Sequence, residues 1–297
     1  MFNKNKLTEW FYGYLFVLPT IIGLGFFYFW PVINCLVISF SEWDGMGAAE
    51  FIGIQNYSKL FQDSNVWNEL GNTFYYTFAM VPISISLSIA FAYILNSKLI
   101  HHKSIFKIIY YLPCITMATA IALIWRWLLN SEYGLVNIVL SWLGITGPIW
   151  LSDPKWLMPA IIIIGIWSSL GYNMILILAG LQGISRTYYE SAEIDGASAF
   201  KKFFYITVPL LSPTIFFISI MAFINAFKMF DTIFMFVGNS TGILLDSIKT
   251  MVYGIYQNGF VFNKMGYASA EAVVLCLIIL TITAIQFLAQ KKWVHYD

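Results

Sequence analysis

The chain has 297 residues, of which 59% are hydrophobic and only 10% are charged, and its formal net charge is +1. A typical soluble domain carries roughly 25% charged residues, so these charges are too few to cover a water-soluble body of this size. The near-zero net charge argues against a nucleic-acid-binding protein, which needs a concentrated basic surface. The composition therefore predicts an all-α membrane protein, because helices satisfy their own backbone groups in lipid.

Six apolar stretches are long enough for membrane-spanning helices, which need about 20 residues each. They are residues 12–40, 72–95, 105–129, 156–181, 207–237 and 267–289. The first stretch is longer than the apolar part of a removable signal peptide, so we expect it to be retained as a span. The first and fifth are long enough to tilt or bend. We expect one membrane domain over residues 1–297, a bundle of about six helices with its core in residues 72–289.

The basic residues predict how the chain is oriented, because cytoplasmic connections carry an excess of lysine and arginine. They gather before the first stretch, in alternate connections and after the last stretch, at Lys4, Lys6, Lys98, Lys103, Lys107, Arg186, Lys201, Lys202, Lys291 and Lys292. The segment 41–71 is acidic instead, with Glu42, Asp44, Glu50, Asp63 and Glu69 offset only by Lys59. We therefore expect both termini in the cytoplasm and the segments 41–71, 130–155 and 238–266 outside.

The metal-binding residue types do not form a recognisable site. The three cysteines, Cys35, Cys114 and Cys276, lie in separate apolar stretches, and their number and spacing fit neither a disulfide framework nor a metal site. We expect them to be buried small hydrophobic residues. All three histidines fall outside the predicted spans and no His-Glu-x-x-His occurs, which argues against an intramembrane enzyme.

The connection 184–209 has an amphipathic helical pattern. Either Ser185 or Thr187 can cap a helix, and Glu190 stands three residues after Thr187, which is capping-box spacing. Gly196 offers a break, and a second amphipathic stretch follows. This pattern predicts a helix, a turn and another helix at the membrane surface. An ordinary solvated loop with a surface helix explains these features equally well.

One spacing in this connection is more specific. Glu190-Ser191-Ala192 is followed after three residues by Gly196, and after nine more by Ile206-Thr207-Val208-Pro209. This arrangement resembles the signature of permease subunits of binding-protein-dependent ABC importers, which is Glu-Ala-Ala, three residues, Gly, nine residues and Ile-x-Leu-Pro. Ser191 stands where Ala is usual and Val208 where Leu is usual.

The resemblance extends along nearly the whole chain and favours the carbohydrate-uptake branch, most closely the first of the two permeases paired in one importer. The segments that carry it, in chain order, are Ser41-Glu42-Trp43-Asp44-Gly45, Phe51-Ile52-Gly53, Asn56-Tyr57, Tyr189-Glu190, Ile194-Asp195-Gly196-Ala197, Met265-Gly266-Tyr267-Ala268-Ser269-Ala270 and Lys292-Trp293-Val294-His295-Tyr296.

The resemblance implies the type I importer fold and a transmembrane subunit that moves a sugar or oligosaccharide across a bacterial or archaeal cytoplasmic membrane. Its implied partners are a second homologous permease, two ATPase subunits, an extracytoplasmic sugar-binding protein and membrane lipid. The chain itself contains no Gly-x-x-x-x-Gly-Lys-Ser/Thr phosphate loop. ATP and Mg are therefore expected on the partner ATPases, with no cofactor on this chain and no enzymatic activity of its own.

The resemblance also assigns roles within the connection, whose first helix would be the coupling helix that sits in a cleft of the ATPase. We expect Glu190 to make a polar contact with the ATPase, Ala192 to allow close approach and Gly196 to form the turn between helices. Asp195 either caps the second helix or contacts the ATPase. The expected coupling residues are Tyr189, Glu190, Ser191, Ala192, Asp195 and Gly196.

Polar residues within spans are expensive and mark functional sites by default. Amides and aromatic rings suit sugars, and the expected substrate-path residues are Trp167, Asn173, Asn225, Lys228 and Asp231. Two structural alternatives stay open: Lys228 and Asp231, three apart on one helix, can neutralise each other, and polar side chains can hold membrane helices together. Arg126 is predicted to be an interfacial anchor that reaches headgroups or a neighbouring helix. Glu271 is a further polar residue near a predicted span.

Two other functions remain open. The same architecture can import a polyol, a glycerol phosphate or an oligopeptide, although the carbohydrate-like segments disfavour this. An ion-coupled secondary transporter would ordinarily have more spans with internal repeats and no use for the Glu190–Pro209 signature. The sequence does not identify the sugar, because half of the translocation cavity would lie on another chain.

Overall fold

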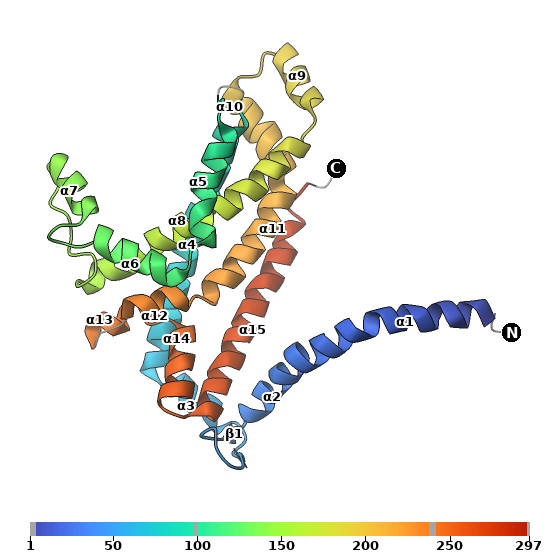
Figure 1. The fold of residues 1–297 in the computed structure, drawn as a ribbon, viewed down its shortest axis with the longest axis vertical. Helices are drawn as coiled ribbons and strands as arrows, with labels where there is room; N and C mark the ends of the chain where they lie inside the picture. The colour runs from blue at the N-terminus through green and yellow to red at the C-terminus, as the bar shows by residue number, and fades with distance from the viewer. Residues whose placement is uncertain (1–3, 98–99, 238–241, 296–297) are drawn as a thin grey trace. The chain divides into compact units, whose positions relative to one another are not determined.

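The computed structural model describes residues 4–97, 100–237 and 242–295 of a chain whose elements are nearly all helices (Figure 1). Lys98 and residues 238–241, which belong to two of the predicted connections, lie outside the described residues. The chain divides into two compact units.

Hydropathy located the membrane-spanning helices correctly, with one exception in shape. Five helices are long and apolar enough to cross a membrane: Trp10–Ile38, Ser64–Asn96, Pro154–Gly183, Ala199–Phe236 and Met265–Gln290. The remaining stretch, predicted as the single span 105–129, is a pair of helices bent by 104°. At the bend, Thr116 Oγ1 donates to the carbonyl of Leu112 at 2.8 Å, and the backbone of Thr116 and Met117 has left the helical region. The hydroxyl takes a carbonyl that the backbone would otherwise use.

The first unit comprises Met1–Asp63 and Ile255–Cys276. In chain order it contains α1 (Lys4–Leu24), the π-helical turn η1 (Gly25–Phe29), α2 (Trp30–Ile38), the strands β1 (Ser41–Glu42) and β2 (Glu50–Phe51), α3 (Gln55–Gln62), the π-helical turn η3 (Gln257–Val261) and the first part of α15 (Met265–Gln290). The two strands form an antiparallel hairpin in which Ser41 pairs with Phe51 and Glu42 with Glu50. None of the apolar window in Trp10–Ile38 is buried within the chain, as expected for a helix that faces lipid or another subunit.

The second unit comprises Ser64–Gly254 and Leu277–Asp297. Its elements are α4 (Ser64–Asn96), α5 (Lys103–Ile115), α6 (Ala118–Leu128), α7 (Leu135–Trp142), α8 (Pro154–Gly183), α9 (Arg186–Ile194), α10 (Ala199–Lys202), the π-helical turn η2 (Phe203–Thr207), α11 (Val208–Phe227), α12 (Asp231–Val237), α13 (Ile243–Asp246), the first part of α14 (Met251–Tyr256) and the second part of α15.

The core of the second unit lies along α4 and α8, which pack against each other, with α5 against α8 and α11 against both. Its largest fully buried side chains are apolar and include Ile161, Met174, Ile177, Leu211 and Ile218. A Cβ built at Gly171 of α8 would lie 1.8 Å from the carbonyl oxygen of Tyr110 in α5. The missing side chain therefore allows the two backbones to approach closely, as small residues do between membrane helices.

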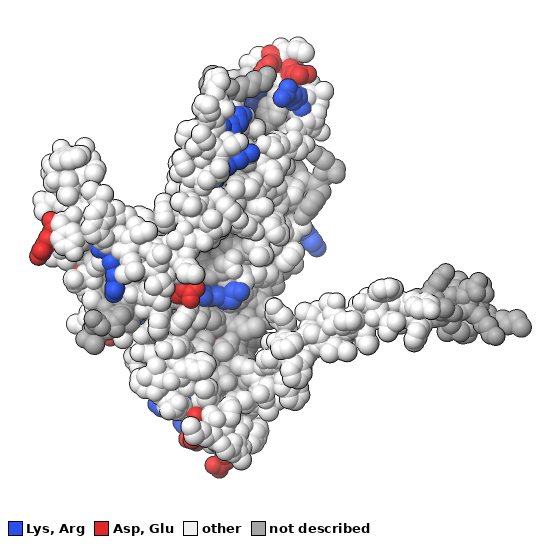
Figure 2. Space-filling model, in the orientation of Figure 1, with Lys and Arg blue, Asp and Glu red and all other residues white. Residues whose placement is uncertain are grey.

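The surface of the second unit separates charged from apolar regions. Charged side chains gather over α9 and α10, whereas the sides of the long helices are almost free of charge (Figure 2). Large apolar side chains are exposed on those helices, for example Phe217 on α11 and Leu280 on α15. An apolar surface this extensive requires a partner or lipid, which agrees with a membrane-embedded bundle.

The prediction that the cysteines are buried is wrong. Cys114 and Cys276 are exposed and Cys35 is half-buried, and all three are free thiols. Apolar neighbours in the sequence do not bury a residue in a membrane helix, because one side of such a helix faces lipid or a cavity.

Candidate functional site

The start of α9 is set by Ser185. Its Oγ accepts a hydrogen bond from the backbone N–H of Thr187 at 3.4 Å, and α9 begins at Arg186. This is the usual N-cap arrangement. The alternative cap at Thr187, with Glu190 completing a capping box, is wrong because Thr187 already lies inside the first turn.

The end of α9 is set by Gly196, as predicted. Its φ is 70°, a conformation that costs glycine nothing and other residues more. The N–H of Gly196 donates to the carbonyl of Glu193 at 3.0 Å, and the N–H of Ala197 to that of Ala192 at 2.9 Å. These two bonds form a Schellman motif, which fixes the direction in which the chain leaves α9.

The second helix is capped by a residue that the sequence interpretation passed over. Ser198 Oγ accepts a hydrogen bond from the N–H of Lys201 at 3.4 Å. The alternative in which Asp195 caps this helix is wrong, because Asp195 is the last residue of the preceding turn and sits at the C-cap of α9.

The outer surface of α9 is polar with one apolar tip. Glu190, Ser191 and Asp195 are exposed and Ala192 is half-buried. Ile194 is 87% exposed. Such exposure is unusual for an isoleucine, and the rest of the helix surface is polar. The sequence analysis named Ile194 only as part of a motif. Its position in the last turn of a short polar helix is the feature that indicates a contact residue.

Two side-chain contacts join α9 to the segment that leads into α11. The hydroxyls of Tyr189 and Thr207 lie 3.0 Å apart, and Thr207 is fully buried. Lys202 Nζ lies 2.7 Å from Glu193 Oε1. Tyr189 therefore points into the chain, unlike the other expected coupling residues, and Thr207 and Glu193 are contacts that the sequence did not reveal.

A cavity of about 520 Å³ opens between α4, α8 and α11 and the segment 228–232; we call it the membrane cavity. It brings together Asn173, Asn225, Lys228 and Asp231, four of the five expected substrate-path residues. Trp167 is not in its lining, and its ring packs edge-on against Trp125 with centroids 5.6 Å apart. Further lining residues that were not singled out are Tyr76, Cys114, Ser168, Ser169 and Thr232.

The amide on the cavity wall is held by a small hydroxyl network. Asn173 Nδ2 donates to Ser84 Oγ at 3.3 Å, and Ser84 Oγ and Ser169 Oγ lie 2.7 Å apart. These bonds join α4 to α8, so the packing alternative holds for Asn173 even though it lines the cavity. Asn225, at the other side, is available to a solute.

Lys228 and Asp231 do not neutralise each other on one helix. α11 ends at Phe227, Lys228 is its C-cap, and Asp231 begins α12. The ion pairs within the described residues are Lys202–Glu193 and Lys249–Glu69. The break between the helices removes the side-by-side geometry of positions three apart, and both charges line the membrane cavity.

Two other polar residues named from the sequence have structural partners. The guanidinium of Arg126 lies over the ring of Phe236 in α12, 5.8 Å from its centroid, so it reaches a neighbouring helix as predicted. In the first unit, Glu271 is fully buried and accepts hydrogen bonds from Asn258 Nδ2 at 2.9 and 3.0 Å.

The fold and these features define a polytopic membrane protein in which a helix outside the apolar bundle is tied to the wall of a polar cavity. The chain belongs to the family described as the binding-protein-dependent transport system inner membrane component, whose model matches residues 62–295.

Known relatives match nearly the whole chain in sequence. It is 36% identical to the probable ABC transporter permease protein YesP of Bacillus subtilis, over 96% of this chain and 92% of that protein. It is 34% identical to the lactose transport system permease protein LacF of Rhizobium radiobacter, over 94% of each chain. A solved structure of a bacterial alginate ABC transporter, in complex with an alginate-bound periplasmic protein, contains a chain with the same fold at a TM-score of 0.84 and 23% identity, covering 97% of this chain and 96% of that one.

The membrane cavity makes a prediction about thiol chemistry. Cys114 lines it and Cys276 does not, although both are exposed. A charged methanethiosulfonate reagent needs a hydrated thiolate, so it should modify Cys114 at least about tenfold faster than Cys276. The measurement compares two variants of the membrane-embedded chain that each keep one of these cysteines and have serine at the other two positions. Equal rates would contradict the prediction that the membrane cavity makes Cys114 the more reactive thiol.

Proposed function

We propose that this chain is the transmembrane subunit of an ATP-driven importer that moves a sugar or oligosaccharide, coupled to a separate ATPase through residues 184–209. Membership of the permease family and the lactose permease among its relatives support this. In this proposal the chain performs no catalysis of its own; ATP and Mg bind to the partner ATPases.

The observation that carries the proposal is the connection between α9 and the membrane cavity. Tyr189 of α9 is hydrogen-bonded to Thr207, Thr207 directly precedes α11, and α11 supplies Asn225 to the cavity. The Lys202–Glu193 ion pair adds a second link. Because a packed helix moves as a rigid element, a push on α9 is transmitted to the cavity wall, where it changes the side to which the cavity opens.

The exposed surface of α9 supplies what an ATPase cleft would contact. Ile194 offers an apolar anchor and Glu190 a charged contact at its edge, the pattern of a small hot spot within a polar rim. A second homologous permease would complete the cavity, two ATPases would bind the pair, and an extracytoplasmic binding protein would deliver the sugar.

The orientation follows from the basic residues. Arg186, Lys201 and Lys202 lie on or beside α9 and α10, so this end is assigned to the cytoplasm by the positive-inside rule. Both termini are placed on the same side, in a bacterial or archaeal cytoplasmic membrane. The segments 41–71, 130–155 and 238–266 then lie outside.

The lining of the membrane cavity suits a hydroxyl-rich solute. Asn225, Ser168 and Tyr172 offer hydrogen bonds and an aromatic surface, and the volume of about 520 Å³ lies in the range of small-molecule sites. Lys228 favours a second candidate, a phosphorylated polyol such as a glycerol phosphate, although Asp231 on the same cavity opposes an anion.

The experiment that tests the proposal is purification of the chain from its native membrane in a gentle detergent, with identification of the co-purifying proteins. A second permease and an ATPase with a phosphate loop are expected. The complex, reconstituted with its binding protein, should import a sugar only with ATP, and competition by lactose or by sn-glycerol 3-phosphate distinguishes the two solutes. Transport by the chain alone, without ATP, would establish an ion-coupled transporter instead.

A further inference from the structure

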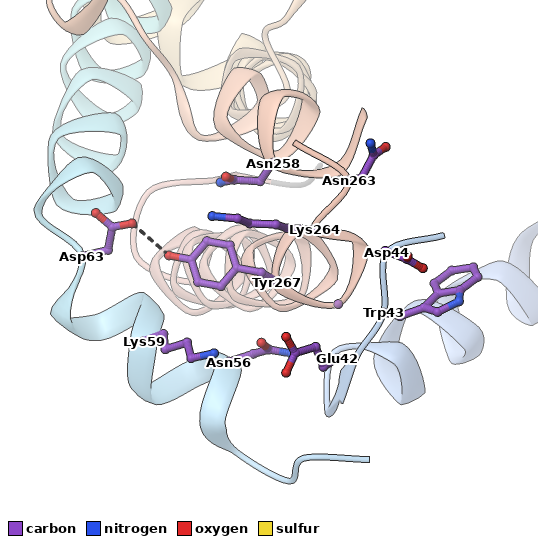
Figure 3. A pocket seen from close by; sticks show the side chains of 11 residues that line it. Glu42, Trp43, Asp44, Asn56, Lys59, Asp63, Asn258, Asn263, Lys264 and Tyr267 are labelled. Atoms are coloured by element: carbon purple, nitrogen blue, oxygen red, sulfur yellow. Dashed lines mark hydrogen bonds between the residues drawn. The ribbon is translucent and has the colours of Figure 1, made fainter. Parts of the chain in front are cut away.

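Three segments that are far apart in the sequence meet around one cavity in the first unit. They are the hairpin segment 41–45, α3 with Asn56, and residues 263–267 at the start of α15 (Figure 3). The cavity has a volume of about 360 Å³, and we call it the hairpin cavity. None of its lining residues lines the membrane cavity, so the proposed transport function does not use it.

The walls of the hairpin cavity are fixed by backbone contacts. The N–H of Gly266 donates to the carbonyl of Trp43 at 3.1 Å. A Cβ built at Gly266 would lie 2.0 Å from the carbonyl oxygen of Ser41. The hairpin therefore lies directly on the start of α15, and only glycine allows this approach.

Asn56 presents an acceptor to the hairpin cavity. It is 4% exposed, and its Nδ2 donates to the carbonyls of Ser39 and Ser41, each at 2.9 Å. Both amide hydrogens are used in these bonds. The amide oxygen makes none of these bonds, and Asn56 lines the cavity. A buried amide held in this way is a preorganised acceptor.

The charged groups add donors and acceptors that the protein does not pair. Within the described part of the chain, no acid lies within 4.0 Å of the ammonium group of Lys59 or Lys264. Glu42 lines the same cavity, whereas Asp63 accepts a hydrogen bond from the hydroxyl of Tyr267 at 3.2 Å. In Figure 3, Lys59 lies on α3 and Lys264 on the facing wall, with the ring of Tyr267 between them and Asn56 and Glu42 beside Lys59.

A ligand of this cavity has to accept hydrogen bonds from the donors and donate hydrogen bonds to the acceptors that line it. An anion would meet Glu42, Asp44 and Asp63, and a cation would meet both lysines. Hydroxyl groups donate and accept without carrying charge, and the ring of Tyr267, which lies among the lining side chains in Figure 3, offers an aromatic surface of the kind that sugar C–H groups contact. We propose that the hairpin cavity binds a neutral saccharide of one or two rings, separately from the membrane cavity.

In the orientation proposed above, the hairpin cavity lies on the extracytoplasmic side. It would then be accessible to a sugar on that side of the membrane. The binding itself requires neither that orientation nor an ATPase, so it can be tested apart from the proposed function.

The test measures saturation-transfer difference NMR signals of lactose and maltose on the purified complex in lipid nanodiscs, without the binding protein. Asn225→Ala is introduced first, to remove the contribution of the membrane cavity. The remaining signal should weaken about tenfold in Lys264→Met and in Glu42→Gln, since each loses a charge-assisted hydrogen bond. Lys155→Met, which changes an exposed lysine outside both cavities, should keep the full signal.

Three results would overturn the proposal. The first is a sugar signal that disappears with Asn225→Ala alone, which would place all binding in the membrane cavity and leave the proposed function intact. The second is no signal with either disaccharide but a signal with glycine betaine, which would indicate a zwitterion site. The third is unchanged sugar binding in Lys264→Met and Glu42→Gln with loss of binding-protein association, which would make the hairpin cavity a docking surface.

Discussion

Ile194→Asp is expected to abolish ATP-driven uptake while the chain still folds and inserts. The side chain is 87% exposed, so an aspartate at this position should change the folding stability of the chain little. At the proposed ATPase contact, the change removes an apolar anchor and introduces a charge that the cleft would have to desolvate. Loss of a hot-spot residue costs about 2 kcal/mol or more, at least about a thirtyfold loss of affinity. Uptake in cells and recovery of the ATPase with the purified permease measure the effect.

The matched control for this prediction is Ile145→Asp. Ile145 is also an exposed isoleucine of the second unit, but it lies in the connection between α7 and α8 rather than on α9. It should leave uptake and ATPase recovery unchanged. Normal uptake and ATPase recovery in Ile194→Asp, at wild-type expression, would show that the tip of α9 is not the contact with the ATPase.

The sequence predicted the position of the membrane helices because lipid imposes a simple length rule. That rule does not tell where a helix bends or breaks within an apolar stretch. The bend at Thr116 lies between two apolar helices, and the break at Lys228 lies within one apolar run of 38 residues. The supposed Lys228–Asp231 pair was wrong for this reason, since it assumed an unbroken helix.

The candidate site was only partly predictable for a related reason. Asn173 and Trp167 lie on the same helix, yet Asn173 lines the membrane cavity and Trp167 packs against Trp125. A helix with apolar residues on every side gives no amphipathic pattern from which to tell one face from another. The signature spacing located α9, but the Tyr189–Thr207 contact depends on how the two helices cross, which residue spacing does not encode.

Glu69 is the clearest case of a residue whose partner could not be identified from the sequence. Glu69 was assigned to an acidic external segment offset only by Lys59. It lies instead inside α4, which begins eight residues before the predicted span, and its Oε1 is 2.7 Å from Lys249 Nζ. The two residues are far apart in the chain, so local charge balance could not identify the pair. Hydropathy underestimated α4 because its first two turns are polar.

Glu69→Ala is expected to be strongly destabilising. The Glu69 side chain is 2% exposed and that of Lys249 14%, so the substitution leaves a lysine charge without its partner in a poorly hydrated place. Breaking a buried ion pair in this way costs about 3–5 kcal/mol. Thr73 adds to the effect, because its hydroxyl donates to the carbonyl of Glu69 and accepts from the N–H of Met251, so that disturbance of this turn reaches α14. Thermal unfolding of the detergent-purified chain should show a large fall in midpoint.

The exposed ion pair on α9 and α10 provides the matched control. Glu193 is 64% exposed in its pair with Lys202, and surface pairs contribute about 0–1 kcal/mol, so Glu193→Ala should shift the midpoint little. The double variant Glu69→Ala with Lys249→Met should regain much of the lost stability, because it removes the stranded charge as well. If Glu69→Ala unfolds at the same temperature as Glu193→Ala, the Glu69–Lys249 pair contributes no more than a surface contact, and α4 must be held by its apolar packing against α8 alone.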